Sequence, residues 1–226
     1  MNPGPDSAEQ PATSAFAPPA DIRLLCADDA WIVVDKPAGL LAVPGRGEAG
    51  RDNLATRVQA HFADALVVHR LDQATSGLML FARGAAAQAR ISQAFALRRV
   101  VKTYVAVVEG QPAGDCGCIE APLAADWPNR PRQVVDAEHG RASTTHWRVL
   151  SRAESGGAAR LALQPVTGRS HQLRVHLQHA GHPIRGDALY APAPLRAERL
   201  LLHACRLRLA HPRDGRECVF DSVVPF

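Results

Sequence analysis

The chain has 226 residues, of which 46% are hydrophobic and 21% are charged, as in ordinary globular proteins. Its formal net charge of +4 permits an acidic partner such as nucleic acid without requiring one. No apolar run approaches the roughly 20 residues that a membrane-spanning helix needs, and the N-terminus lacks the order of a secretory signal. Five cysteines without zinc-like spacing fit reduced thiols. We therefore expect a cytoplasmic protein.

The first 20 residues differ in composition from the rest of the chain. They contain five of the 17 prolines and almost no apolar periodicity. Such a segment buries too little surface to offset the entropy lost on ordering. We therefore predict a disordered tail over residues 1–20 and a single folded domain over residues 21–226.

Strands and helices alternate in the first half of this domain. Residues 30–35 predict a strand that a turn at Lys36 and Pro37 ends. Residues 51–65 predict a helix because apolar side chains recur every four residues. A strand over 78–82 and an alanine-rich helix over 85–98 follow. Residues 100–109 then alternate as a strand that ends at Gly110.

The second half is predicted to be richer in strands. Residues 111–140 contain many Pro, Gly and Cys residues and are predicted to be irregular. Residues 143–150 and 159–166 alternate and form an expected hairpin. A helix is expected after the capping residue Ser170, with Leu173, Leu177 and Ala180 on its apolar face, and it ends at Gly181. Strands over 200–210 and 218–221 complete the predicted sheet.

The polar stretch HRLDQATSG, residues 69–77, lies between two apolar runs that read as strands. It holds one carboxylate, Asp72, next to a cation, Arg70. A carboxylate on a loop held rigidly between strands is a plausible chemical centre. An aspartate that only forms a turn is the alternative. The residues alone leave both interpretations open.

The pattern HRLDxxTSG resembles the signature of the RluA-type pseudouridine synthases. Four further runs resemble motifs of that family in the same order, namely DKPAGLLAVPG at 35–45, KTYVAVVEG at 102–110, GRSHQLRVH at 168–176 and GHPIRGDALYA at 181–191. The resemblance covers residues 22–226. It implies an α+β pseudouridine synthase fold, with a long, mixed, mostly antiparallel sheet, flanking helices and a central RNA-binding cleft.

The resemblance also implies a reaction and its residues. Members of this family isomerise uridine in RNA to pseudouridine without a cofactor, and Asp72 corresponds to the catalytic aspartate. Arg174 corresponds to the arginine paired with that aspartate. Tyr104 corresponds to the tyrosine beside it, which stacks on the uracil, and Arg70 to the residue that fills the space of the flipped base.

The run DWPNRP, residues 126–131, resembles the short, dual-specificity member of the family. This implies specific uridines in stem-loops of 23S ribosomal RNA, of the tRNA anticodon arm, or of both. The tail is too short for the accessory S4 domain of many relatives, and we expect a monomer with no obligate protein partner. The candidate RNA-binding residues are Lys36, Arg70, Lys102, Arg130, Arg132, Arg169 and His171.

Two other classes of function compete with this interpretation. His176, His179 and His182 recur every third residue, near the spacing of helical metal ligands. However, no HExxH motif occurs and Gly181 ends the predicted helix before His182, which disfavours a metal hydrolase. An RNA-binding module without activity is the second alternative, and the intact Asp72, Tyr104 and Arg174 argue against it.

Overall fold

A computed structural model describes residues 22–192 and 197–226, so the expected tail over 1–20 lies outside the described residues. Ten strands form one mixed sheet. They are β1 (Arg23–Ala27), β2 (Trp31–Lys36), β3 (Ala65–Val67), β4 (Ser76–Arg83), β5 (Val101–Glu109), β6 (Cys116–Glu120), β9 (Thr144–Arg152), β10 (Ala158–Pro165), β11 (Leu202–Ala210) and β12 (Glu217–Asp221). A second, small sheet pairs β7 (Leu123–Ala125) with β8 (Gln133–Val135). The helices are α1 (Leu54–His61), α2 (Gly84–Ala96), α3 (Gln172–His179) and the short 3-10 helix η1 (Glu48–Gly50).

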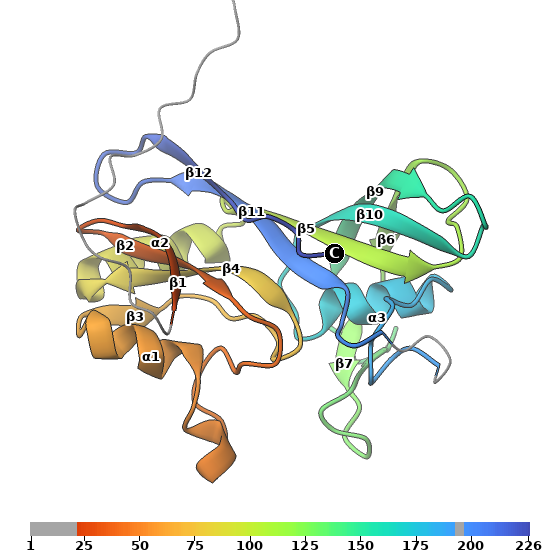
Figure 1. Cartoon of the computed structure of the whole chain (residues 1–226), viewed down its shortest axis with the longest axis horizontal. Helices are drawn as coiled ribbons and strands as arrows, with labels where there is room; N and C mark the ends of the chain where they lie inside the picture. Colours follow the sequence, from red (N-terminus) through yellow and green to blue (C-terminus); the bar gives the residue numbers. More distant parts are fainter. Residues whose placement is uncertain (1–21, 193–196) are drawn as a thin grey trace, which may run out of the picture.

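The large sheet runs β1-β2-β4-β11-β5-β10-β9-β6, with β3 paired to β4 and β12 to β11. Every pair is antiparallel except β4 with β11, which is parallel. Figure 1 shows α1 and α2 beside the strands at one end of the sheet and α3 beside those at the other end. The late strand β11 lies between β4 and β5 and so joins the two halves.

The junction of β4 and β11 depends on Gly77. Its φ of +112° is in the region that favours glycine, and a Cβ there would lie 2.3 Å from the carbonyl oxygen of Ala204. Ala204 is the register partner of Gly77 on β11. The glycine of the HRLDxxTSG pattern is therefore required for the two backbones to approach each other.

Strands β2 and β4 are buried on both faces, so their side chains supply two hydrophobic clusters. Met79 and Phe81 of β4 pack with α1 residues such as Val58 in one cluster. Leu78 and Leu80 of β4 pack in the other, together with Ile91 of α2. The period of two along a strand therefore places α1 and α2 on opposite faces of the same strands.

A third cluster builds the other half of the domain. Ala106 and Val108 of β5 and Leu161 and Leu163 of β10 are fully buried there against α3. Leu173 and Leu177, expected on the apolar face of the helix, supply the α3 contribution. This packing fixes α3 across the sheet and turns its first residues toward the loop that contains Asp72.

Most predicted elements are confirmed, and three details are wrong. Helix α1 is shorter than the expected 51–65, because the Asn53 side chain caps it by accepting the backbone N–H of Thr56 at 2.9 Å. Strands β6, β7 and β8 lie within residues 111–140, which were expected to be irregular. Helix α3 begins at Gln172, with His171 and not Ser170 in the capping position.

Candidate active site

A cavity of about 530 Å³ opens between the two halves of the domain. Its wall combines the 68–75 segment, the end of α2, strand β5 and the residues from Pro165 to Arg174. A cavity of this size lies in the usual range for small-ligand pockets. Among the lining residues in the described part of the chain, Asp72 is the only carboxylate.

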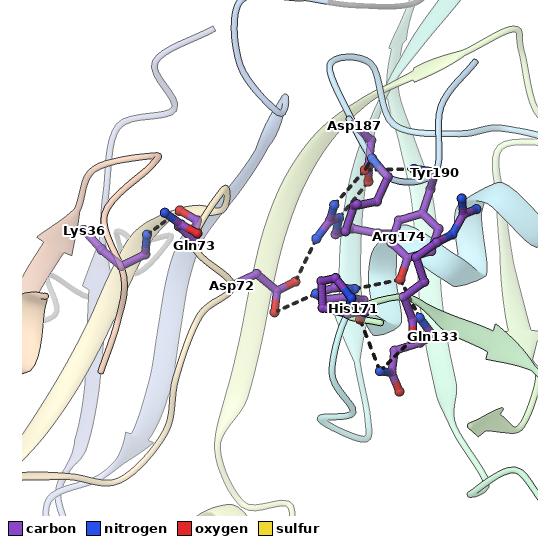
Figure 2. A network of polar contacts seen from close by, with 11 residues as sticks. Lys36, Asp72, Gln73, Gln133, His171, Arg174, Asp187 and Tyr190 are labelled. Carbon is purple, nitrogen blue, oxygen red and sulfur yellow. Dashed lines mark hydrogen bonds and ion pairs between the residues drawn. The ribbon is translucent and has the colours of Figure 1, made fainter. Parts of the chain in front are cut away.

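The loop that contains Asp72 joins β3 to β4 and rests on the turn after β2. The ammonium of Lys36 donates hydrogen bonds to the carbonyl oxygens of Pro37, Leu40 and Gln73 at 2.7 to 3.0 Å. Gly39 and Gln73 also exchange two hydrogen bonds, one from the Gly39 N–H and one from the Gln73 side-chain amide. These contacts fix the residue next to Asp72 (Figure 2).

Lys36 corrects one expectation from the sequence. Its side chain is completely buried, and its three carbonyl partners satisfy the donor capacity of an ammonium group. Burial lowers its pKa to about 8, although the negative charge of Asp72 opposes the shift. Lys36 therefore supports the active loop from beneath and is not placed to contact a phosphate.

His69 holds the other end of the same loop. Its Nε2 accepts the backbone N–H of Leu80 at 2.9 Å, and its ring stacks on Phe95 with the ring centres 4.8 Å apart. Burial, assisted by the charge of Lys102, lowers the pKa of His69 to about 3. The imidazole is therefore neutral at physiological pH and acts as a fixed acceptor in the wall of the cavity.

Arg174 of α3 connects Asp72 to a second carboxylate. Its Nη1 lies 3.6 Å from Oδ2 of Asp72, while its Nε and Nη2 each donate a 2.7 Å hydrogen bond to Asp187. Asp187 is buried and also accepts the backbone N–H groups of Leu189 and Tyr190. Asp187 therefore fixes the guanidinium, whose remaining nitrogen faces Asp72 (Figure 2).

The nearest partner of Arg174 is therefore not the carboxylate that the sequence predicted. Its tightest partner is Asp187, which was not predicted as a site residue, and Asp72 is a longer contact. Burial disfavours the charged guanidinium, but the hydrogen bonds and charge of Asp187 outweigh it, so the pKa of Arg174 is raised. A permanent positive charge is thus held beside Asp72.

Tyr104 of β5 lines the same cavity and is partly buried. Burial raises the pKa of its phenol, and the negative charge of Asp72 raises it further. The phenol therefore stays protonated at neutral pH, beside the carboxylate.

His171 and Tyr190 complete the group around Asp72. The Nε2 of His171 lies 4.0 Å from Oδ1 of Asp72, and its Nδ1 lies 2.7 Å from the Tyr190 hydroxyl. The same hydroxyl accepts the backbone N–H of Gln133 at 2.8 Å. The carboxylate is therefore flanked by an arginine from one side and an imidazole from another (Figure 2).

Comparison with known proteins now decides the family. Residues 30–179 match the family of RNA pseudouridylate synthases. A Yersinia pestis protein named dual-specificity RNA pseudouridine synthase RluA is 46% identical over 205 residues, which are 90% of this chain and 99% of the relative. The RluA of Escherichia coli K12 is 44% identical over 215 residues, 93% of this chain and 98% of the relative.

The chain belongs to the RNA pseudouridylate synthase family. The structure agrees with this, because human RNA pseudouridylate synthase domain containing 1 superposes with a TM-score of 0.76 at 26% identity, covering 93% of this chain and 87% of that one. Human RNA pseudouridylate synthase domain containing 4 gives 0.72 at 26% identity, covering 90% and 88%. The predicted α+β synthase fold is confirmed. The protein is an enzyme that isomerises uridine in RNA.

Apart from Lys36, the predicted RNA-binding residues of the synthase fall into two groups. Arg70, Lys102, Arg169 and His171 line the cavity with Arg98, which the sequence did not single out. Arg98 has a positive φ of 57° because it ends α2: the N–H groups of Arg98 and Arg99 donate to the carbonyls of Phe95 and Ala94, as in a Schellman C-cap. The guanidinium groups of Arg70, Arg98 and Arg169, together with that of Arg174, give the cavity a positive wall.

The second group lies on the loop before β8. The guanidinium of Arg130 lies 4.2 Å from the ring centre of Trp127, whose side chain is 66% exposed. The guanidinium of Arg132 lies 5.3 Å from the ring centre of Tyr190. The exposed planes of Trp127 and Arg130 are suited to stacking on RNA bases.

Of the three spaced histidines, His176 is buried, and its ring nitrogens contact the hydroxyl of Thr145 and the carbonyl of Ala121, both at 3.0 Å. The Nδ1 of His182 contacts the carbonyl of Glu109 at 3.0 Å. These rings have structural partners.

In the described residues, no helix is long and apolar enough to cross a membrane.

Proposed function

We propose that the synthase modifies specific uridines in stem-loops of both 23S ribosomal RNA and the tRNA anticodon arm, with Asp72 as its catalytic carboxylate. The observation that carries the assignment of Asp72 is its position as the single carboxylate among the described residues lining the cavity. The dual targets are supported by the similarity to relatives named dual-specificity enzymes over nearly their whole length.

The reaction breaks the bond between N1 of uracil and C1′ of ribose, rotates the base and joins C5 to C1′. It requires one carboxylate, either as a nucleophile or as the base that removes the C2′ proton. The guanidinium of Arg174 lies 3.6 Å from this carboxylate and orients it for either role. Tyr104 stacks on the uracil, and its phenol oxygen takes up the C5 proton as the phenol passes its own proton to the Asp72 carboxylate in the same cavity.

RNA reaches Asp72 only after the target base leaves its stack, at a cost of a few kcal/mol. Arg70 is exposed beside Asp72 and fills the vacated space by stacking. Arg98, Lys102 and Arg169 hold the backbone phosphates around the cavity. Arg130 and Arg132, with Trp127, contact the flanking loop nucleotides.

Mapping of pseudouridines tests the targets directly. Total RNA from cells with and without the gene is compared, and pseudouridines that disappear in both 23S ribosomal RNA and tRNA are expected. Return of those sites with the wild-type gene, but not with Asp72→Asn, supports both parts of the proposal. Loss of sites in only one RNA class contradicts dual specificity, and restoration by Asp72→Asn contradicts the catalytic assignment.

We further propose that residues 21–226 act as one monomeric, cytoplasmic domain that needs no metal or organic cofactor. Removal of residues 1–20 is then expected to leave activity and unfolding temperature unchanged. Size-exclusion chromatography is expected to give the apparent molecular mass of a monomer. Full turnover in EDTA is expected. Retained RNA binding without turnover, in any buffer, favours the binding-module alternative.

A further inference from the structure

His171 occupies an unusual position at the start of α3. Its backbone is left-handed, with φ of 53°, and no side chain caps the helix at this residue. The following residue, Gln172, is instead fixed by Thr167, Thr144 and Thr145. A strained conformation maintained by its surroundings is typical of functional sites. Here it places the imidazole between Asp72 and Tyr190, with 12% of the side chain exposed.

The contacts of Tyr190 determine which ring nitrogen of His171 carries the proton. A backbone N–H can only donate, so the Tyr190 oxygen is the acceptor of the 2.8 Å bond from Gln133. The phenol proton then has Nδ1 of His171, at 2.7 Å, as its acceptor. In the reverse arrangement, Nδ1–H would donate to the phenol and leave the phenol proton without a partner among the contacts of the described residues. Therefore Nδ1 accepts, and Nε2–H points toward Asp72.

The charges around His171 are compatible with a neutral ring. Burial lowers its pKa, the carboxylates of Asp72 and Asp187 oppose this, and the guanidinium groups of Arg174 and Arg70 reinforce it. The pKa of Tyr190 is raised, chiefly by burial, so its phenol retains the proton that it donates.

We propose that His171 is a positioning residue that orients the Asp72 carboxylate through Nε2–H, with its tautomer set by Tyr190 and the Gln133 backbone. The present distance of 4.0 Å exceeds a hydrogen bond, and a shift of about 1 Å closes it. Catalytic hydrogen bonds are often long before substrate binds and tighten in the complex.

The chain of contacts from Asp72 through His171 and Tyr190 to Gln133 also extends to the loop before β8, which is proposed to bind RNA. Gln133 is the first residue of β8, directly after the segment that presents Trp127 and Arg130. Arg132, on the same segment, lies over the ring of Tyr190. RNA bound to this loop can therefore shift the position of Tyr190 and, through the contact between Tyr190 and His171, bring the imidazole closer to Asp72. This gives the synthase a means to complete its site only when the flanking nucleotides are bound.

The tautomer is measured by nitrogen NMR of the histidine side chains, with His171 assigned by its absence in His171→Gln. We expect a neutral ring protonated at Nε2 in the wild type and a mixture of tautomers in Tyr190→Phe, which lacks only the hydroxyl. A wild-type ring protonated at Nδ1 overturns the proposal, as does an unchanged tautomer in folded Tyr190→Phe.

Single-turnover kinetics test the effect on catalysis, which rests on the proposed role of Asp72. Tyr190→Phe is expected to slow the chemical step about tenfold and His171→Ala about 100-fold, with RNA affinity within about twofold. His171→Gln, whose amide N–H also reaches toward Asp72, should recover part of the loss. His179→Ala, on the exposed side of the same helix, is the matched control with wild-type rates.

Equal losses in His171→Gln and His171→Ala, or losses in affinity instead of rate, overturn the positioning role. If Tyr190→Phe does not fold, the wild-type tautomer and the Gln–Ala comparison still decide. An active Asp72→Asn enzyme would remove the proposed catalytic residue, whereas the NMR result stands independently of it.

Discussion

Replacement of Arg174 by methionine should destabilise the protein and slow catalysis for two separable reasons. The variant leaves Asp187, whose side chain has no exposed surface, without its cation. Removal of one partner from a buried ion pair costs about 3–5 kcal/mol, far more than the pair itself contributes. For a chain of this length that corresponds to a fall of about 6–20 °C in the unfolding temperature.

The second effect concerns Asp72. At 3.6 Å and an effective dielectric constant near 20, the guanidinium attracts the Asp72 carboxylate by about 4–5 kcal/mol before desolvation is subtracted. Its loss removes both a charge and an orienting group, so we expect single-turnover rates to fall by about two orders of magnitude.

The double variant Arg174→Met/Asp187→Asn separates the two effects. Asparagine keeps an oxygen for the backbone N–H groups of Leu189 and Tyr190 but buries no charge. Denaturant unfolding should therefore recover most of the lost stability, while the rate stays low. If activity returned together with stability, Arg174 would be only a structural residue. If the single variant lost less than about 1 kcal/mol, the buried pair would be unimportant.

Four further outcomes follow from the site. Asp72→Asn should abolish turnover and leave RNA affinity near wild type, since affinity rests mostly on phosphate contacts; measurable turnover in a pure preparation contradicts the assignment. Tyr104→Phe should slow tritium release from C5-labelled uridine by about 100-fold, whereas wild-type release would leave Tyr104 as a packing residue. Lys36→Met should cost about 2–3 kcal/mol in unfolding free energy by leaving carbonyls unpaired, and retained stability with weaker RNA binding would restore its phosphate role. The fold should lose stability as pH falls below about 6.5, because the partly buried His69 and the buried His176 and His203 have lowered pKa values, so the unfolded chain binds protons that these side chains exclude in the folded state. Urea midpoints that rise on acidification would contradict this.

The sequence predicted which residues meet in the cavity better than it predicted the contacts that support them. Asp72, Tyr104 and Arg174 are far apart in the chain, and only the motif resemblance indicated that they meet. Lys36 was predicted to bind RNA because its side chain is charged. The sequence does not show that this side chain is buried. Asp187 lies in the GHPIRGDALYA motif at 181–191. Its hydrogen bonds to Arg174 join residues 13 positions apart, a separation that matches neither helix nor strand periodicity, so the sequence did not reveal them.

The fold shows the same division between local and distant information. Strands with regular alternation, such as β5 and β10, were found because a period of two is a local signal. Strands β6, β7 and β8 have three to five residues and lie among Gly, Pro and Cys residues, so local propensity does not reveal them. The left-handed residue His171 precedes Gln172, whose side chain bonds Thr144 and Thr145 at separations of 28 and 27 residues, and no local rule anticipates such contacts.

The position of β11 has a consequence for how the enzyme matures. Its His203 contacts Ser76 of β4 across 127 positions of the chain, and the same strand pairs with β5 on its other edge. During synthesis on a ribosome, Asp72 and Arg174 are therefore both made before the strand that aligns their two half-sheets. Such distant pairing is slow to form, so the nascent chain passes through a stage in which each half has a core but no shared cleft. Catalytic competence should thus appear as a late, abrupt event in biogenesis, timed by the last strands to emerge.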